Sequence, residues 1–160
     1  MRTVWIVAWP DEDLVRKAVV LSAMIRSASA VWTGDLKSGN GHFSVESGAF
    51  ANQPYSFRTR FESEPGTNPE ELIAAAHASC FSMALSAQLG ERGIADAKIE
   101  TKCAITFESG TLSHSLLTTK VSAPGVDKAK VEEAAAAAKA GCPISRVLNL
   151  EIALDLTVVG

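Results

Sequence analysis

The side chains of this sequence that are best suited to nucleophilic or redox chemistry are those of its three cysteines, Cys80, Cys103 and Cys142. An odd and sparse set of cysteines in a chain of 160 residues is unlike the even disulfide framework of a small secreted protein. In a reducing compartment, such cysteines serve as core residues, as metal ligands or as reactive thiols. Their surroundings in the sequence help to decide among these roles.

The surroundings of Cys103 and Cys142 indicate two different environments. Cys103 lies on the apolar face of a predicted strand, where we expect a buried thiol to behave as a small hydrophobic residue. Cys142 precedes Pro143 and a predicted short helix, and the unpaired N–H groups at a helix start stabilise a thiolate. Both a reactive thiol and an inert capping residue remain open for Cys142.

Cys80 lies in the middle of a predicted helix among alanines, which by itself indicates a core position. His77 precedes it by about one helical turn, so the ring and the thiol could share a face. This spacing allows a Cys/His nucleophile pair or a metal site. A sequence with three histidines and no CxxC or HxxxH spacing argues against zinc.

Strands are predicted in the first part of the chain. One spans residues 28–32, a glycine-rich turn follows over 34–41, and a strand or hairpin covers 42–46. In residues 55–62, mainly apolar side chains alternate with polar or charged ones, which predicts a half-buried strand with a charged outer face. The residues expected to share its inner face are Tyr55, Phe57, Thr59 and Phe61.

A long helix is predicted from Pro69 to about Leu89. Thr67 or Asn68 can cap its start, and the two glutamates that follow suit the positive end of the helix dipole. Small residues fill the middle of this helix, which indicates that another element approaches it closely. We therefore expect it to be central.

Further elements are predicted in the second half of the chain. Strands are expected over residues 98–107, 112–122 and 151–159, with a helix over 128–140 and a short helix over 144–148. Strands in blocks with helices between them are typical of an α+β fold rather than of a doubly wound sheet.

Charge and hydropathy exclude several classes of function. The 15 basic and 18 acidic residues give a net charge of −3 without a basic stripe, so we expect no nucleic-acid partner. No uninterrupted run of about 18 apolar residues occurs, so we expect no membrane span and a cytoplasmic protein. The length predicts one domain over residues 27–160, with an N-terminal extension of unknown role over residues 1–26.

Three segments together resemble the family of osmotically inducible protein C and the organic hydroperoxide resistance proteins. They cover residues 53–62, 66–85 and 139–145, and the long central one suits the osmotically inducible branch. The resemblance extends from about residue 28 to the end of the chain. It implies an α+β fold with antiparallel sheets around long central helices, in an intertwined homodimer.

The resemblance also implies a thiol peroxidase that protects against oxidative and osmotic stress. Such an enzyme reduces organic hydroperoxides and hydrogen peroxide without haem, flavin or metal, and an external dithiol resets it. The family pattern makes Cys80 the peroxidatic cysteine and Cys142 the resolving cysteine. It places the supporting arginine at Arg60 and the glutamate that holds this arginine at Glu70.

The family roles conflict with local physical chemistry at two points. A helix start favours Cys142 as the more acidic thiol, so attack by Cys80 requires Arg60 to reach it. Glu70 precedes Cys80 by ten residues, which is about 15 Å along a helix. Either Glu70 of one chain serves near Cys80 of another chain, or Arg60 spans the gap.

Three other functions are compatible with these residues. A peroxide-responsive redox sensor would use Cys80 and Cys142 without turnover. A small-molecule binding scaffold would use its thiols only structurally. A Cys/His acyl-transfer enzyme would use His77 as its base.

Overall fold

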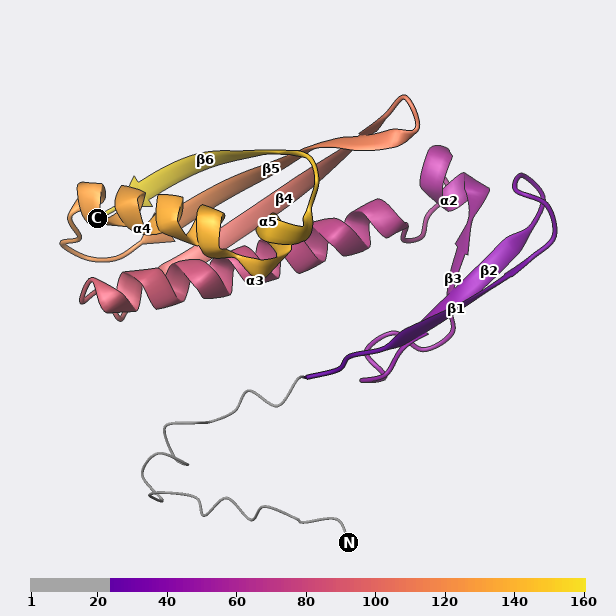
Figure 1. The fold of residues 1–160 in the computed structure, drawn as a ribbon, viewed down its shortest axis with the longest axis horizontal. Coiled ribbons are helices and arrows are strands. Elements are labelled where there is room, and N and C mark those ends of the chain that lie inside the picture. Colours follow the sequence, from indigo (N-terminus) through magenta and orange to yellow (C-terminus); the bar gives the residue numbers. More distant parts are fainter. Residues whose placement is uncertain (1–23) are drawn as a thin grey trace, which may run out of the picture.

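The computed structural model describes residues 24–160, and its elements form two parts (Figure 1). A small sheet lies at one end, and a larger body of helices and a second sheet lies at the other end, which carries the C-terminus. The extension predicted over residues 1–26 falls almost entirely outside the described residues and stays a prediction. The α+β fold class is confirmed.

The small sheet is an antiparallel meander of three strands in the order β1 (Ala28–Thr33), β2 (Asn40–Val45) and β3 (Gln53–Ser56). Aromatic side chains pack across it, and the Trp32 and Tyr55 ring centroids are 5.5 Å apart. A Cβ at Gly41 would lie 2.7 Å from Cε1 of Tyr55, so this strand position requires glycine.

The strand predicted over residues 55–62 is wrong beyond Ser56. The chain turns there into a short helix, α2 (Phe57–Phe61). Ser56 Oγ accepts a hydrogen bond from the backbone N–H of Thr59 at 3.1 Å, and Thr59 Oγ1 accepts one from the N–H of Ser56 at 3.0 Å. This reciprocal cap starts the helix. Phe57 and Phe61 then lie one turn apart, with ring centroids separated by 4.8 Å.

The predicted long helix is confirmed as α3 (Pro69–Glu91). Asn68 caps it, because its side chain accepts a hydrogen bond from the N–H of Glu71 at 2.9 Å. One face of α3 is buried, and the residues on that face are His77, Phe81, Leu85 and Leu89. The other face carries small side chains and Met83, whose exposed fraction is 75%.

The second sheet has the order β4 (Lys98–Glu108), β5 (Thr111–Ser122) and β6 (Glu151–Val159). β4 and β5 are antiparallel, but β6 runs parallel to β5, so this sheet is mixed rather than wholly antiparallel as the resemblance implies. The connection between β5 and β6 contains α4 (Lys128–Gly141) and α5 (Pro143–Val147). A parallel neighbour needs such a long crossover.

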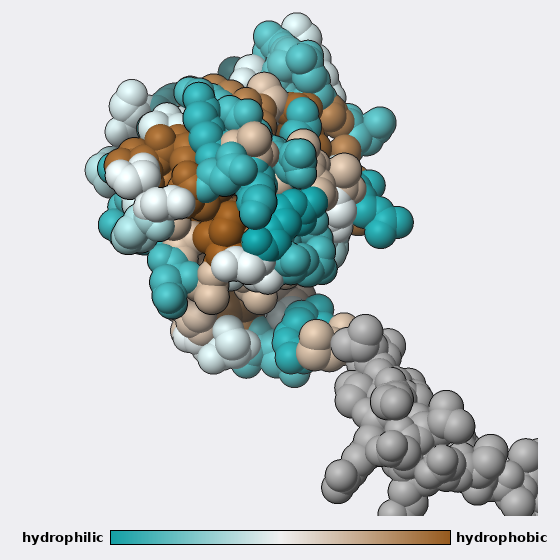
Figure 2. All heavy atoms as spheres, turned by 90° about the vertical axis from the view of Figure 1, so that its left-hand side faces the viewer, coloured by the Kyte–Doolittle hydropathy of each residue, from teal (hydrophilic) through white to brown (hydrophobic). Residues whose placement is uncertain are grey.

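The core lies between this sheet and the two long helices, which cover one of its faces (Figure 1). The alanines of α4 allow close packing, and Ala134, Ala135 and Ala138 are buried. Hydrophobic atoms also reach the surface at the end of the body that faces left in Figure 1 (Figure 2).

α3 is long and apolar enough to cross a membrane by length and composition. The expectation of no membrane span overlooked it because glutamates, serines and a histidine interrupt its apolar residues. The core helix of a soluble protein passes the same test. One face of α3 packs on β4 and α4, and the rest of the helix is mostly exposed in a single chain.

Candidate active site

Two of the three cysteines meet in the body. Cys80 lies in the middle of α3, and Cys142 lies at the junction of α4 and α5, both of which pack on α3. Cys80 packs against the core cluster that contains Cys142, each thiol affects the pKa of the other, and both thiols are free. The fold therefore brings together two thiols from distant parts of the sequence.

The two thiols differ in their access to solvent. Cys142 is completely buried, with an exposed fraction of 0%, whereas Cys80 is partly exposed. A small solute can therefore approach Cys80 but not Cys142. A modified Cys80 would in turn be presented directly to Cys142.

The two thiols also differ in acidity. Burial raises the pKa of Cys80. The backbone N–H of Ile144 acts to lower this pKa, but the neighbouring Cys142 acts to raise it further. Burial also acts to raise the pKa of Cys142, but hydrogen bonds from Ser145, Cys80 and the N–H of Ile144 outweigh it, so this pKa is lowered. Within one chain Cys142 is the more acidic thiol, as the helix start predicts.

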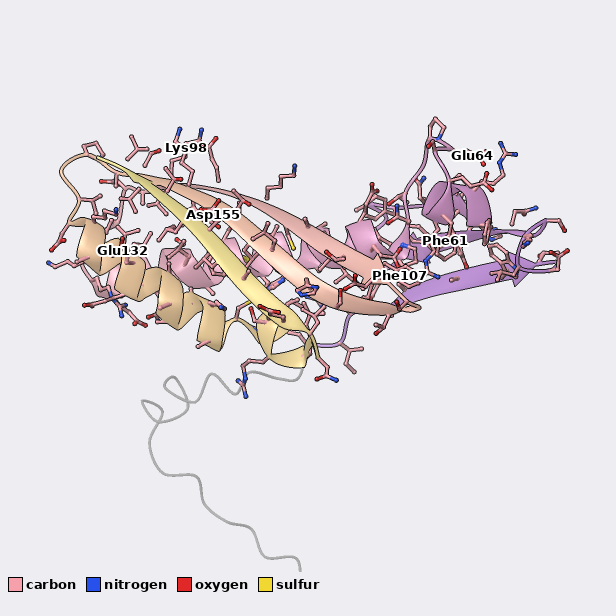
Figure 3. All side chains as sticks on the ribbon, turned by 90° about the horizontal axis from the view of Figure 1, so that it is seen from above. Phe61, Glu64, Lys98, Phe107, Glu132 and Asp155 are labelled. Carbon is pink, nitrogen blue, oxygen red and sulfur yellow. The ribbon has the colours of Figure 1, made fainter. Side chains whose placement is uncertain are left out.

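Arg60 and Glu70 form an ion pair at the other end of α3. Arg60 Nη2 lies 2.7 Å from Glu70 Oε1, and Arg60 Nε lies 3.2 Å from both carboxylate oxygens. The guanidinium also lies over the rings of Phe61 and Phe107, at 4.9 and 5.2 Å from their centroids. Figure 3 shows these two rings beside each other where the β4–β5 hairpin meets α2.

Hollows flank the Arg60 side chain on two sides. One, of about 300 Å³, is lined by Phe61, Glu70, Ile105 and Phe107 among others. The second, of about 270 Å³, has aromatic walls from the first sheet and α2. A cation held between apolar walls can bind the polar end of a small molecule that is otherwise apolar.

The structure does not bring the two halves of the predicted site together within one chain. Arg60 is held at the second residue of α3, and Cys80 lies ten residues further along the same helix, about 15 Å away. Within residues 24–160, Arg60 forms its ion pair with Glu70 and none of its hydrogen bonds reaches Cys80.

Sequence reasoning missed the surroundings of His77. Its ring is completely buried and turned into the core, where Nδ1 lies 2.8 Å from Ser115 Oγ and Nε2 lies 2.8 Å from Ser145 Oγ. Sγ of Cys103 lies 3.2 Å from Ser115 Oγ. The alternation of β5 could have placed Ser115 inward, but no local pattern marks Ser145 as its counterpart.

The arrangement disfavours two of the chemistries that the spacing of His77 and Cys80 allowed. Both nitrogens of His77 are engaged by serine hydroxyls, which leaves neither free to take a proton from Cys80. Among residues 24–160, no group of three or more His, Cys, Asp or Glu side chains is arranged to hold a metal ion.

Comparison with known proteins connects the chain to one family. The family model described as OsmC-like protein matches residues 61–157. The Peroxiredoxin OsmC of Escherichia coli is 47% identical over 134 residues, which cover 81% of this chain and 94% of that protein.

Solved structures share this architecture. The crystal structure of the organic hydroperoxide resistance protein OhrB of Bacillus subtilis matches with a TM-score of 0.57 and 27% identity, over 81% of this chain and 97% of that one. An OsmC-like protein from Mycoplasma pneumoniae matches with a TM-score of 0.62 over 86% of this chain and 99% of that one. At 13% identity, this second likeness concerns the fold alone.

Proposed function

The chain belongs to the family of OsmC-like proteins, and from this membership and its thiol pair we propose that it is a thiol-dependent peroxidase. Its substrates are organic hydroperoxides and hydrogen peroxide. The names of its relatives, a peroxiredoxin and an organic hydroperoxide resistance protein, support a role in detoxifying peroxides under stress. The observation that carries the proposal is the contact between a partly exposed Cys80 and a completely buried Cys142.

The catalytic cycle uses both thiols in turn. The Cys80 thiolate attacks one peroxide oxygen, the O–O bond breaks, and the leaving alkoxide or hydroxide takes up a proton. Cys80 is then a sulfenic acid. The Cys142 thiolate attacks its sulfur, a disulfide forms, and hydroxide leaves as water after protonation. An external dithiol reduces the disulfide, which fits a reducing compartment such as the cytoplasm.

The proposed cycle needs a cation at Cys80, because burial alone raises the pKa of this thiol. We propose that Arg60 and Glu70 of a second copy of the chain complete each site in a homodimer. The long separation of Arg60 from Cys80 within one chain supports this arrangement. The exposed face of α3, with its small side chains and Met83, supports close packing of a second copy.

Peroxide consumption by purified protein tests the proposed cycle. With a dithiol present, we expect repeated turnover of an alkyl hydroperoxide by the wild type and none by Cys80→Ser. Cys142→Ser should consume one equivalent per chain, because the sulfenic acid cannot be resolved. Ser82→Ala, which removes a hydroxyl two residues from Cys80, is the matched control and should keep turnover.

Two outcomes would change the assignment. Repeated turnover in Cys80→Ser would refute attack by this thiol. Wild-type protein that consumes one equivalent of peroxide and then stops, even with dithiol or monothiol present, would instead indicate a redox sensor.

A further inference from the structure

A chain of polar side chains leads from Cys142 into the body. Cys142 is the N-cap of α5, and Ser145, three residues later in the first turn of this helix, is among the groups that lower the pKa of Cys142. The same hydroxyl lies 2.8 Å from Nε2 of His77, whose Nδ1 lies 2.8 Å from Ser115 Oγ. Ser115 Oγ in turn lies 3.2 Å from the sulfur of Cys103. Four side chains from four elements are thus connected in series, and the Ser145 end of the series lies in the helical turn that Cys142 begins.

The central members of this series are buried. His77, Ser115 and Cys142 have no exposed surface, and Ser145 is almost fully buried. An imidazole and two hydroxyls in a core are costly unless every polar atom is paired. Here they are paired, since no buried side-chain N or O among residues 24–160 lacks a partner. The peroxidase cycle described above makes no use of His77, Ser115 or Cys103.

The hydrogen bonds of this series have a donor-to-acceptor direction, because His77 is neutral. Burial lowers the pKa of His77, and a neutral imidazole has one donor nitrogen and one acceptor nitrogen. If Nε2 donates to Ser145, the hydroxyl of Ser145 can donate to Cys142. If Nδ1 carries the proton instead, Ser145 must donate to Nε2, and Cys142 loses this hydrogen bond.

The Cys103 end of the series can favour one of these two tautomers. Burial raises the pKa of Cys103, so its sulfur keeps its proton and can donate to Ser115 Oγ. The hydroxyl of Ser115 then donates to Nδ1 of His77. In this arrangement the proton on the ring is on Nε2, which is the tautomer that leaves Ser145 free to donate to Cys142.

We propose that His77 is a positioning residue which acts through Ser145 to hold a hydrogen-bond donor on the sulfur of Cys142, and that Cys103 and Ser115 set the tautomer of its ring. This role deepens the proposed function, because it prepares Cys142 for the resolving step. In that step the Cys142 thiolate forms the S–S bond, the S–O bond of the Cys80 sulfenic acid breaks, and hydroxide leaves. Ser145 keeps its proton throughout and only stabilises the charge before attack.

The test measures thiolate formation by ultraviolet absorbance as the reduced full-length protein is titrated with base. In a Cys80→Ser background, Cys142 and Cys103 are the remaining thiols, and Cys103 titrates later because its pKa is raised. The Cys80→Ser/Cys142→Ser variant supplies the blank. Besides Cys103, the titratable group that acts on Cys142 in this background is His77, behind Ser145.

Loss of the donor should raise the pKa of Cys142 by about 1, a tenfold fall in the thiolate to thiol ratio, since hydrogen bonds to charged groups are the strong ones. We expect this for both Ser145→Ala and His77→Leu. Combining the two should add little to either alone, because His77 acts through Ser145. His77→Gln, which can still present an N–H, should recover part of the effect. Ser115→Ala should give a smaller rise.

Ser82→Ala is the control, since it removes a partly buried hydroxyl from the same α3–β4 interface outside the series. If His77→Leu does not fold, as judged by circular dichroism, the proposal is tested by comparing the pKa of Cys142 in Ser145→Ala and in Ser82→Ala. Equal Cys142 pKa values in these two variants would overturn the proposal. So would additive effects of His77→Leu and Ser145→Ala in folded protein.

The titration uses no peroxide, so it separates this proposal from the peroxidase assignment. Protein that titrates as expected but consumes no peroxide would refute the proposed function alone. Protein that turns over peroxide while His77 and Ser145 variants leave the Cys142 pKa unchanged would refute the positioning role alone.

Discussion

Mixing two inactive variants tests whether each active site is shared between two chains. Arg60→Ala lacks the guanidinium and Cys80→Ser lacks the attacking sulfur, so each variant alone should be inactive. In a mixed dimer with the proposed shared site, the Cys80 of the first chain would face the intact Arg60 of the second. One complete site would therefore form in each mixed dimer, although neither chain carries a complete set.

The size of the recovery follows from the symmetry of a twofold dimer. Equal amounts of the two variants that exchange at random give mixed dimers as half of the total, and one of two sites is complete in each. The expected turnover is about one quarter of the wild-type rate. A site built within one chain would give none, and the separation of about 15 Å along α3 argues against such a site.

The assay is peroxide consumption with excess dithiol after the two variants have been allowed to exchange subunits. Tags of different size on the two variants report how much mixed dimer has formed. Arg60→Ala mixed with Glu70→Gln is the control, because both lesions fall in the same ion pair and every site stays damaged. Mixed dimers of Arg60→Ala and Cys80→Ser that form in the expected amount without activity would refute the shared site.

Three further predictions concern stability and pH. Phe81→Ala, at a fully buried position on α3, should lower the free energy of unfolding by about 3–5 kcal/mol in urea titrations, and a loss below 1 kcal/mol would contradict its place in the core. Ser56→Ala should cost about 1 kcal/mol by removing the cap of α2, measured in the same way against Ser47→Ala, whose hydroxyl is exposed. Burial lowers the pKa of His77 from 6.5, so on acidification the unfolded chain takes up a proton at this ring before the folded chain does. The free energy of unfolding should therefore fall as the pH drops below 6.5 towards the folded-state pKa. A His77→Gln variant that keeps the full wild-type slope in that pH range would show that this ring does not cause it.

Much of the fold follows from local signals in the sequence. Asn68 and Pro69 mark the start of α3, although Thr67 also fits as its cap, and the residues predicted for the last strand coincide with β6. The helix α2 was mistaken for a strand because Phe57 and Phe61 fit both patterns. They are an even number of residues apart, as on one face of a strand, and four apart, as on one face of a helix. The cap between Ser56 and Thr59 decided the outcome.

The features that sequence reasoning missed depend on packing between distant elements. The direction of β6 relative to β5 is set by the crossover through α4 and α5, which no alternation within a strand reveals. The same crossover carries Ser145 to His77, 68 residues away in the sequence. The helix start predicted the acidity of Cys142, but its place against Cys80 depends on how α5 docks on α3.

The acidities of the two thiols link reactivity to assembly. A single chain has them in the wrong order for the proposed cycle, because burial raises the pKa of Cys80 while Cys142 has its pKa lowered. The first thiol to react with peroxide has to be a thiolate. A guanidinium from a second chain would favour the Cys80 thiolate, and the Ser145 donor would keep Cys142 ready once Cys80 is oxidised. On this reasoning the second chain supplies the charge that starts the cycle, while His77 and Ser145 prepare the thiol that completes it, so the mixing experiment and the thiol titration test separate halves of one mechanism.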